Sequence, residues 1–98
     1  MKIIISPPIA EKLAQKHGGI REAEIRQAFL NRTGPILMDD REEHASDPPT
    51  LWFCAMTDTG RMLKIVYIRR DLAIFLKTAY EPGLPTVALY RRKCLQAR

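Results

Sequence analysis

Three strand-like runs succeed one another between residues 51 and 79, and this arrangement constrains the fold more than any other feature. The runs span residues 51–57, 61–69 and 72–79, and each is rich in apolar and β-branched residues. A tight turn, Asp58 to Gly60, separates the first two. Connections this short join antiparallel neighbours. We therefore expect a mainly antiparallel sheet whose second and third strands, apolar on both faces, are covered by helices.

The first half of the chain predicts a short strand followed by two helices. Residues 2–5 form a β-branched run, and the Ser6-Pro7 pair that follows suits the start of a helix. Apolar residues then recur at helical spacing until Gly18 supplies a left-handed stop. A second helix is expected over residues 21–31, and another strand over residues 36–38.

The end of the chain allows two interpretations. Residues 85–97 predict a short helix, although residues 86–90 could also form an edge strand. Residues 39–50 are polar and acidic, and this long loop could be functional or mobile. The expected fold is one α+β domain over residues 1–98. It has two N-terminal helices packed on a mainly antiparallel, four- to five-stranded sheet, and a short C-terminal helix.

Positive charge is concentrated in the second half of the chain. Residues 1–58 hold seven Lys and Arg against nine Asp and Glu, a net charge of −2. Residues 59–98 hold nine against two, a net charge of +7. A surface this basic suits an anionic partner, meaning RNA, DNA or an acidic protein. The alternative is a solvated face that only keeps the protein soluble.

Several classes of protein find no support in the sequence. No run of about 18 apolar residues exists to span a membrane, and the apolar run in residues 1–5 is too short for a signal peptide. We therefore expect a cytoplasmic protein. Cys54 in an apolar run and Cys94 in a basic tail predict one buried and one free thiol, without a disulfide. The acidic residues around His44 lack calcium-loop spacing, so we expect neither a metal nor a cofactor.

Two lysines on the predicted hairpin are the first candidates for a site. A turn at residues 70–71 would place Lys64 directly opposite Lys77 on a mostly apolar face. Like charges in that position repel by up to about 1 kcal/mol, so the pair favours an anion such as a phosphate. Alternatively, both ammonium groups reach solvent or pair with Glu22 or Glu24. A bulge or a three-residue turn would abolish the pairing.

Four residues at the exit of the same hairpin could cleave RNA without a metal. Such cleavage needs a base for the 2′-hydroxyl proton, a donor for the leaving oxygen, and cations for the phosphate. Glu81 could be the base and Tyr80 the donor. The cations would be Lys77 and Arg61, with Arg61 expected opposite Tyr80. The alternative is that Tyr80 and Glu81 are ordinary surface residues at a strand end.

Basic and aromatic residues provide candidates for nucleic-acid binding. The candidates for phosphate contact share a basic side chain: Lys64, Arg91, Arg92 and Lys93. Tyr90 and Trp52 could stack on bases. Trp52 precedes an apolar strand, however, and could equally belong to the core.

Short pieces of sequence spread over residues 12–80 form a recognisable pattern. They are Lys16-His17-Gly18, the helix start Ile20 to Glu24 with Ala28-Phe29, Asp39 to Arg41, Leu51 to Thr57, Gly60 to Tyr67, and Thr78-Ala79. In this order they resemble the BrnT-type toxins of bacterial type II toxin–antitoxin systems. The resemblance implies a RelE-like fold, ribonuclease activity on messenger RNA, and neutralisation by a small DNA-binding antitoxin. It also implies functional roles for Lys16 and Arg61, so Lys16 joins the nucleic-acid-binding candidates.

Other positions depart from that family's pattern. Tyr80 stands where the family has an Arg, Phe75 replaces another Arg, and residues 89–93 differ from the family's C-terminal motif. We therefore expect a ribonuclease toxin or a toxin-derived relative, its activity lost or rebuilt around Lys77 and Tyr80. The alternative is a non-catalytic nucleic-acid- or protein-binding regulatory module on the same fold. The expected partners are RNA and a small antitoxin protein, and a homodimer stays open.

The chain also looks like small bacterial proteins labelled ADP-ribosyl-(dinitrogen reductase) hydrolase. True members of that hydrolase class are much larger, helical and metal-dependent, and this sequence has none of their ligand sets. We therefore do not expect that activity.

Overall fold

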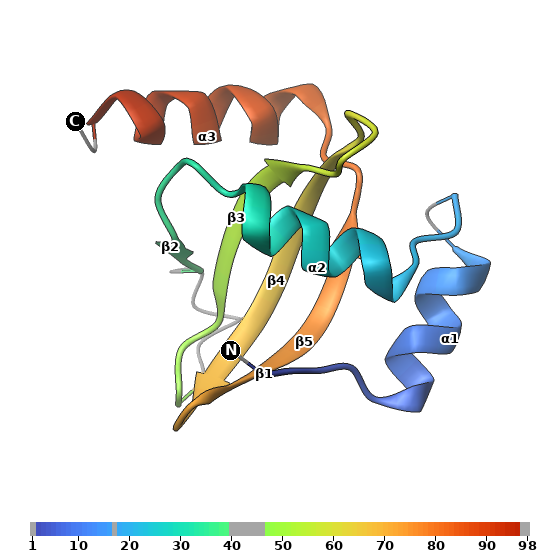
Figure 1. Cartoon of the computed structure of the whole chain (residues 1–98). Coiled ribbons are helices and arrows are strands. Elements are labelled where there is room, and N and C mark those ends of the chain that lie inside the picture. Colours follow the sequence, from blue (N-terminus) through green and yellow to red (C-terminus); the bar gives the residue numbers. More distant parts are fainter. Residues whose placement is uncertain (1, 17, 40–46, 97–98) are drawn as a thin grey trace.

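The computed structural model describes residues 2–16, 18–39 and 47–96 and combines helices with one sheet (Figure 1). Its elements in chain order are β1 (Lys2–Ile4), α1 (Pro7–Gln15), α2 (Glu22–Asn31), β2 (Leu37–Met38), β3 (Leu51–Met56), β4 (Met62–Arg70), β5 (Ala73–Tyr80) and α3 (Leu84–Gln96). The predicted α+β class and the predicted order of elements are therefore confirmed. No helix in the described part of the chain is both long and apolar enough to cross a membrane.

The five strands form one sheet in the order β1-β5-β4-β3-β2. The run β3-β4-β5 is antiparallel throughout, as the short turns predict, and β2 pairs antiparallel with β3. At the other edge β1 pairs parallel with β5. The sheet is thus mixed, and the expectation of a mainly antiparallel sheet needs this correction. The sequence of β1 does not indicate this parallel pairing, because a strand of three residues carries no signal of its direction relative to its neighbour.

Helix α2 lies across one face of the sheet (Figure 1). Ile25 and Ala28 have no exposed surface, and the Phe29 ring meets the rings of Phe53 and Tyr67 edge-on at 4.9 and 5.4 Å. Helix α1 instead stands at the edge of the sheet beside β5. The prediction of two N-terminal helices packed on the sheet is therefore right for α2 and wrong for α1.

Alternation along the strands fills the space under α2 with apolar side chains. We call this side of the sheet the covered face. Its buried strand residues are Phe53, Ala55, Leu63, Ile65, Tyr67, Ile74, Leu76 and Ala79. Burying the large members of this set, such as Phe53, Leu63 and Ile65, stabilises a fold by about 1.5–3 kcal/mol each. This layer is therefore the main core of the molecule.

Helix α3 packs against the opposite side of the sheet, near β3. Tyr90 anchors it, because its ring lies 5.7 Å from the Trp52 ring and its hydroxyl donates a 2.7 Å hydrogen bond to the Pro35 carbonyl oxygen. Gly34 allows the close approach, since a Cβ there would lie 2.5 Å from the Tyr90 hydroxyl oxygen and 2.7 Å from the Cys94 sulfur. The C-terminal segment is thus a helix, and the alternative edge strand is wrong.

The register of the β4–β5 hairpin differs from the predicted one. Its turn is Asp71-Leu72, with Asp71 at φ 54°, so β4 runs one residue further than a turn at residues 70–71 would allow. A bulge then shifts the pairing between Val66 and Tyr67, and Lys77 becomes the extra residue of β5. Lys64 consequently lies opposite Tyr80.

Two expectations are wrong for this reason. Lys64 does not face Lys77 across the hairpin, and Arg61 does not lie opposite Tyr80. The repulsion expected between directly opposed lysines is therefore absent from this hairpin. The roles of the Lys64 and Lys77 ammonium groups therefore depend on the other side chains around each of them.

Candidate nucleic-acid interface

The face of the sheet turned away from α2 is only partly covered. Along β4, Leu63, Ile65 and Tyr67 are buried, whereas the alternate residues Lys64 and Val66 are only half-buried. Helix α3 covers the side near β2 and β3 and leaves the side near β4 and β5 accessible. We call this side the open face. The expectation that helices cover both faces of the central strands is thus wrong for one face.

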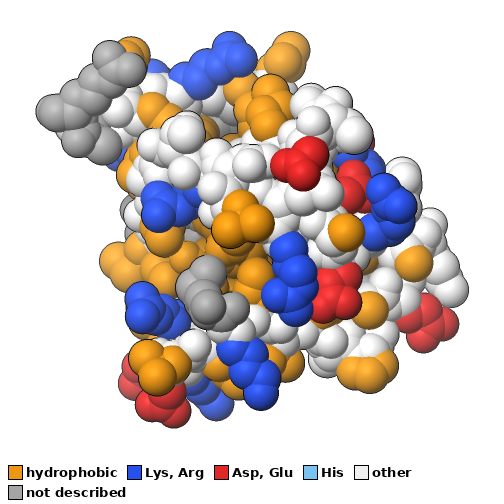
Figure 2. Space-filling view, viewed as in Figure 1, with side chains coloured by type: hydrophobic (Ala, Val, Ile, Leu, Met, Phe, Trp, Pro, Cys, Tyr) orange, Lys and Arg blue, Asp and Glu red, His pale blue; other side chains and the backbone are white. Residues whose placement is uncertain are grey.

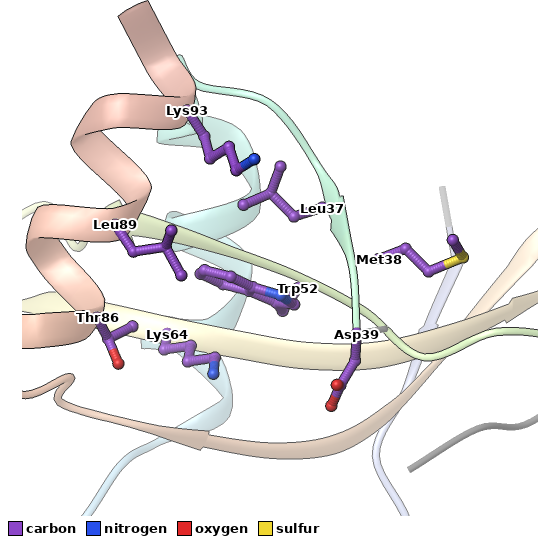
Figure 3. A pocket seen from close by; sticks show the side chains of 8 residues that line it. All are labelled: Leu37, Met38, Asp39, Trp52, Lys64, Thr86, Leu89 and Lys93. Carbon is purple, nitrogen blue, oxygen red and sulfur yellow. The ribbon is translucent and has the colours of Figure 1, made fainter. Parts of the chain in front are cut away.

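Two adjoining hollows of about 670 and 420 Å³ lie on the open face. Both are lined by Asp39, Trp52 and Lys64, and we call them together the basic hollow. The larger part is completed by Leu37, Met38, Thr86, Leu89 and Lys93. Figure 3 shows Leu37 from β2 and Thr86, Leu89 and Lys93 from α3 pointing toward the Trp52 ring, whereas the Met38 side chain extends away from it. The smaller part is completed by Lys12, Thr50, Val66, Lys77, Thr78 and Tyr80. Hollows of this size are typical of small-molecule sites.

Lys64 lies where the two parts of the basic hollow meet. Its ammonium nitrogen is 4.4 Å from the centre of the Trp52 ring and 5.7 Å from that of Tyr80. Within the described part of the chain, no carboxylate oxygen lies within 4.0 Å of this nitrogen. Aromatic rings attract a cation without neutralising it. The charge of Lys64 is therefore fixed in place and directed at the hollow.

Three more lysines reach the basic hollow from different elements. Lys77, at the β5 bulge, donates a 3.3 Å hydrogen bond to the Thr50 hydroxyl. Lys12 comes from α1 at the sheet edge, and Lys93 comes from α3. Four cations thus converge on one hollow. Lys12 was not among the candidates predicted from the sequence. We expected α1 to pack on the sheet, whereas it lies at the sheet edge beside β5, and this position brings Lys12 to the hollow.

Arg61 and Glu81 lie outside the basic hollow and contact each other. The Arg61 Nε donates to the Glu81 carboxylate, its Nη1 lies 3.2 Å from a Glu24 carboxylate oxygen, and the Gly19 carbonyl oxygen accepts a third bond at 3.3 Å. The structure therefore divides the four predicted catalytic residues. Lys77 and Tyr80 line the hollow, while Arg61 and Glu81 join the start of α2 to the strand ends.

The electrostatics of this second group are those of a structural clamp. Burial alone would raise the pKa of Glu24, but hydrogen bonds from the Arg21 backbone N–H and the Arg61 guanidinium outweigh it, so the pKa lies below its ordinary value. The hydrogen bond to Glu81 raises the pKa of Arg61. Glu24 thus pairs with Arg61, and Glu22 pairs with Arg26 at 3.0 Å. Neither glutamate contacts Lys64 or Lys77, contrary to one sequence-based alternative.

The remaining basic candidates lie at different distances from the hollow. Lys93 lines it, whereas Arg91 and Arg92 are exposed elsewhere on α3. Lys16 is exposed at the end of α1 and does not line the hollow. His17, His44 and most of the acidic loop lie outside the described residues. Among the described residues, no three His, Cys, Asp or Glu side chains gather in a way that could hold a metal ion.

The predicted stacking residues serve the core instead. Trp52 and Tyr90 are only 8% and 5% exposed, so neither presents a ring face for stacking on bases, and the core interpretation of Trp52 is confirmed. Burial raises the pKa of Tyr90 to about 12, which keeps the hydroxyl protonated as a donor. Burial also raises the pKa of the Cys54 thiol to about 11. Cys54 and Cys94 are both unpaired by disulfides, as expected.

Asp39 is the carboxylate that sequence reasoning did not connect with this site. It follows β2, and its backbone N–H donates a 2.8 Å hydrogen bond to the Thr50 carbonyl oxygen. This bond places its side chain in both parts of the basic hollow. In the sequence it is one of several acids in a long loop, and no local pattern separates it from the others.

The molecule's other side has a different surface. In Figure 2, which views the molecule from the side of α2, acidic and basic side chains lie interspersed. Among the residues that the structure describes, the basic hollow in contrast gathers four lysines around one aspartate. Lys64, Lys77 and Lys93 thus bring part of the positive charge of residues 59–98 to the open face.

No protein-family model, curated protein or solved structure matches this chain.

Proposed function

We propose that this protein binds single-stranded RNA through the basic hollow. The observation that carries the proposal is the position of Lys64, whose ammonium rests on the Trp52 and Tyr80 rings and has no carboxylate within 4.0 Å in the described part of the chain. A cation held in this way is ready to accept a phosphate oxygen. The resemblance to BrnT-type toxins supports RNA as the source of that phosphate.

Charge balance supports the same proposal. Four lysines around one hollow repel each other, and each carries a hydrated ammonium that phosphate can bind. An RNA strand places successive phosphates along a groove and releases its own bound cations when lysines replace them. The two adjoining parts of the hollow give such a strand a path from the side of α1 to the side of α3.

A salt titration tests this proposal. Binding of a fluorescein-labelled 12-nucleotide RNA is measured by fluorescence polarisation for wild type, Lys64→Gln and Lys77→Gln between about 50 and 200 mM salt. Each variant should bind several-fold more weakly, and its slope of log Kd against log salt should fall by about 0.7. Arg70→Gln is the matched control, because it removes one positive charge at the far end of β4 from Lys64.

The outcomes separate this interface from the others. Weaker binding by Lys64→Gln and Lys77→Gln, with Arg70→Gln unchanged, supports the hollow. Unchanged binding by both lysine variants would contradict it. If only Arg91→Gln or Arg92→Gln weakened binding, the interface would be the exposed side of α3.

Metal-independent ribonuclease activity is a second proposed function, favoured by the position of Tyr80. Its ring lies beside the Lys64 ammonium, and its residue is opposite Lys64 in the sheet. In this reaction the 2′-oxygen would attack the phosphorus while solvent water takes the 2′-hydroxyl proton, and the bond to the 5′-oxygen would break. The Tyr80 phenol would donate a proton to the leaving 5′-oxygen, and Lys64 and Lys77 would stabilise the charge on the phosphate. Arg61 and Glu81 are engaged with each other, so their contribution would be to hold the strand ends.

Cleavage is tested separately from binding. A labelled RNA is incubated with enzyme and a metal chelator, and its products are resolved on a denaturing gel. Wild type should cleave, and Tyr80→Phe should bind RNA normally but cleave at least about a hundredfold more slowly. Binding without any cleavage by wild type would leave the protein a non-catalytic module.

A further inference from the structure

We propose that the smaller part of the basic hollow binds the terminal phosphate of an RNA strand. This inference rests on the proposed binding of RNA and names the end of the strand as the group that the hollow selects. Among the described residues, three lysines and one carboxylate line this part of the hollow: Lys12, Lys64, Lys77 and Asp39. They leave an excess of two positive charges. An internal phosphate of RNA carries one negative charge and balances only half of this excess.

Each of the three lysines comes from a different element. Lys12 lies on α1 at the sheet edge, Lys64 lies on β4, and Lys77 lies at the bulge of β5. The Lys64 ammonium is 4.4 Å from the centre of the Trp52 ring, and Lys77 donates its 3.3 Å hydrogen bond to the Thr50 hydroxyl. In the described part of the chain, no carboxylate oxygen lies within 4.0 Å of any of these three ammonium nitrogens. Their charge is therefore left for a ligand.

The two kinds of phosphate in RNA differ in charge and in the number of their free oxygens. A phosphate monoester at a strand end carries a charge of about −1.5 to −2 at pH 7 and three oxygens that accept hydrogen bonds. A phosphodiester inside the strand carries one charge and two such oxygens. An ammonium group is a compact charge with three donors, and its hydrogen bonds to ionised oxygens are roughly twice as strong as neutral ones. Three ammonium groups around one hollow thus match the three oxygens and the higher charge of a terminal phosphate.

The rest of the strand fits the larger part of the hollow. That part has a volume of about 670 Å³, and its walls from Leu37 and Leu89 are apolar, so it admits the nucleoside next to the terminal phosphate. Figure 3 shows Lys93 reaching this part from α3, where its ammonium is placed for the following phosphate. A terminal phosphate would occupy the place of a scissile one, so this inference concerns binding and not the second proposed function.

The experiment compares three short oligouridylates as competitors of the fluorescein-labelled 12-nucleotide RNA. Two have six nucleotides, one with a 5′-phosphate and one with a 3′-phosphate. The third has eight nucleotides and two hydroxyl ends, so its total negative charge is at least that of the other two. Wild type should bind one of the phosphorylated RNAs roughly tenfold more tightly than the third, the effect of about one additional charge-assisted hydrogen bond. The RNA that binds more tightly identifies the bound phosphate as 5′ or 3′.

Two lysine substitutions test whether the smaller part of the hollow is responsible. Lys12→Gln should reduce the preference to less than about threefold, because one of the three ammonium groups is lost. Lys2→Gln is the matched control and should keep the preference, because it makes the same substitution at an exposed residue of β1 that does not line the hollow. Lys12 is also exposed, and glutamine has nearly the helix propensity of lysine, so both variants should fold. Circular dichroism verifies this.

The results distinguish this inference from the proposed function. If the eight-nucleotide RNA competes as well as the phosphorylated RNAs, or if none of the three competes, selection of a terminal phosphate is overturned while RNA binding stands. A preference that Lys12→Gln retains, or that Lys2→Gln loses to the same extent, overturns the assignment to the smaller part of the hollow. Absence of binding by the labelled RNA itself overturns both the inference and the proposed function.

Discussion

The covered face and the open face belong to the same strands but differ in burial and in the kind of side chain they carry. Ile65 on the covered face has no exposed surface and lies under α2, whereas its neighbour Val66 lines the basic hollow and is half-buried. The first face holds apolar side chains that are buried under α2, and burial of this kind is what stabilises small domains. The second carries lysines that stabilise little. The comparison suggests that stability is concentrated on one face, which leaves the other available for binding.

Charged residues follow the same division. On the side of α2, Arg61 is neutralised by two carboxylates, Glu24 and Glu81, and acts as a structural tie. On the open face, Lys64 rests on aromatic rings. A cation paired with carboxylates from two elements holds those elements together, whereas a cation supported by rings keeps its charge for a ligand. Both arginine and lysine are basic in the sequence, and only their partners distinguish the two roles.

The largest expected effect on stability is the difference between substitutions at two neighbouring residues of β4, one on each face. Ile65→Ala should lower the free energy of unfolding by about 2–5 kcal/mol, because it leaves a cavity in the covered face. Val66→Ala should lower it by at most about 1 kcal/mol, because its side chain is already half in solvent. Urea denaturation monitored by circular dichroism measures both. Equal losses would show that the open face is packed as tightly as the covered one.

A second prediction concerns how α3 is attached to the open face. Gly34→Ala should destabilise the fold by about 1–3 kcal/mol, because the new Cβ would overlap the Tyr90 hydroxyl and the Cys94 sulfur. Gly83→Ala is the matched control, since its Cβ would meet its nearest neighbour, Pro85, at an ordinary 3.8 Å. Trp52 fluorescence should report a wetter environment only in Gly34→Ala. A neutral effect at Gly34 would mean that α3 docks more loosely than its contacts indicate.

The clamp at Glu24 predicts a dependence of stability on pH. Its pKa is lowered in the folded protein, so its contribution is complete above the ordinary value of 4.5 and is lost as the pH falls through the lower folded value. Glu24→Gln should cost about 1.5 kcal/mol at pH 7. It should also flatten the fall in stability between about pH 5 and 3. Urea midpoints at several pH values test this, and parallel curves for both proteins would exclude Glu24 as a source of the acid sensitivity.

The elements were predictable from sequence because their signals are local. Alternating apolar residues, the turn at Asp58 to Gly60, and the helical spacing before Gly18 all act within a few positions. The burial of Cys54 followed from the same patterns, whereas these patterns left Trp52 open between the core and stacking on bases. None of these features depends on which distant segments meet.

The candidate site was less predictable because it depends on long-range geometry. One extra residue at the Lys77 bulge places Lys64 opposite Tyr80, and nothing local in β5 marks that bulge. Arg61 has acidic partners 37 and 20 residues away in sequence. Lys12 reaches the hollow only because α1 lies at the edge strand. Charge distribution indicated a basic surface, but the fold decided which cations compose it.

The smallest expected effect on stability is that of Lys77→Ala, and it tests directly whether the open face contributes less to stability than the covered face. Lys77→Ala removes an exposed side chain whose described contact is one 3.3 Å hydrogen bond to Thr50, so the free energy of unfolding should change by less than about 0.5 kcal/mol. Removing one of four mutually repelling cations from the hollow could even stabilise the fold slightly. Urea denaturation at low and high salt measures this, with the difference from wild type shrinking as salt screens the repulsion. A decrease in the free energy of unfolding of more than about 1 kcal/mol would instead make Lys77 a structural residue. The open face would then contribute to stability as the covered face does.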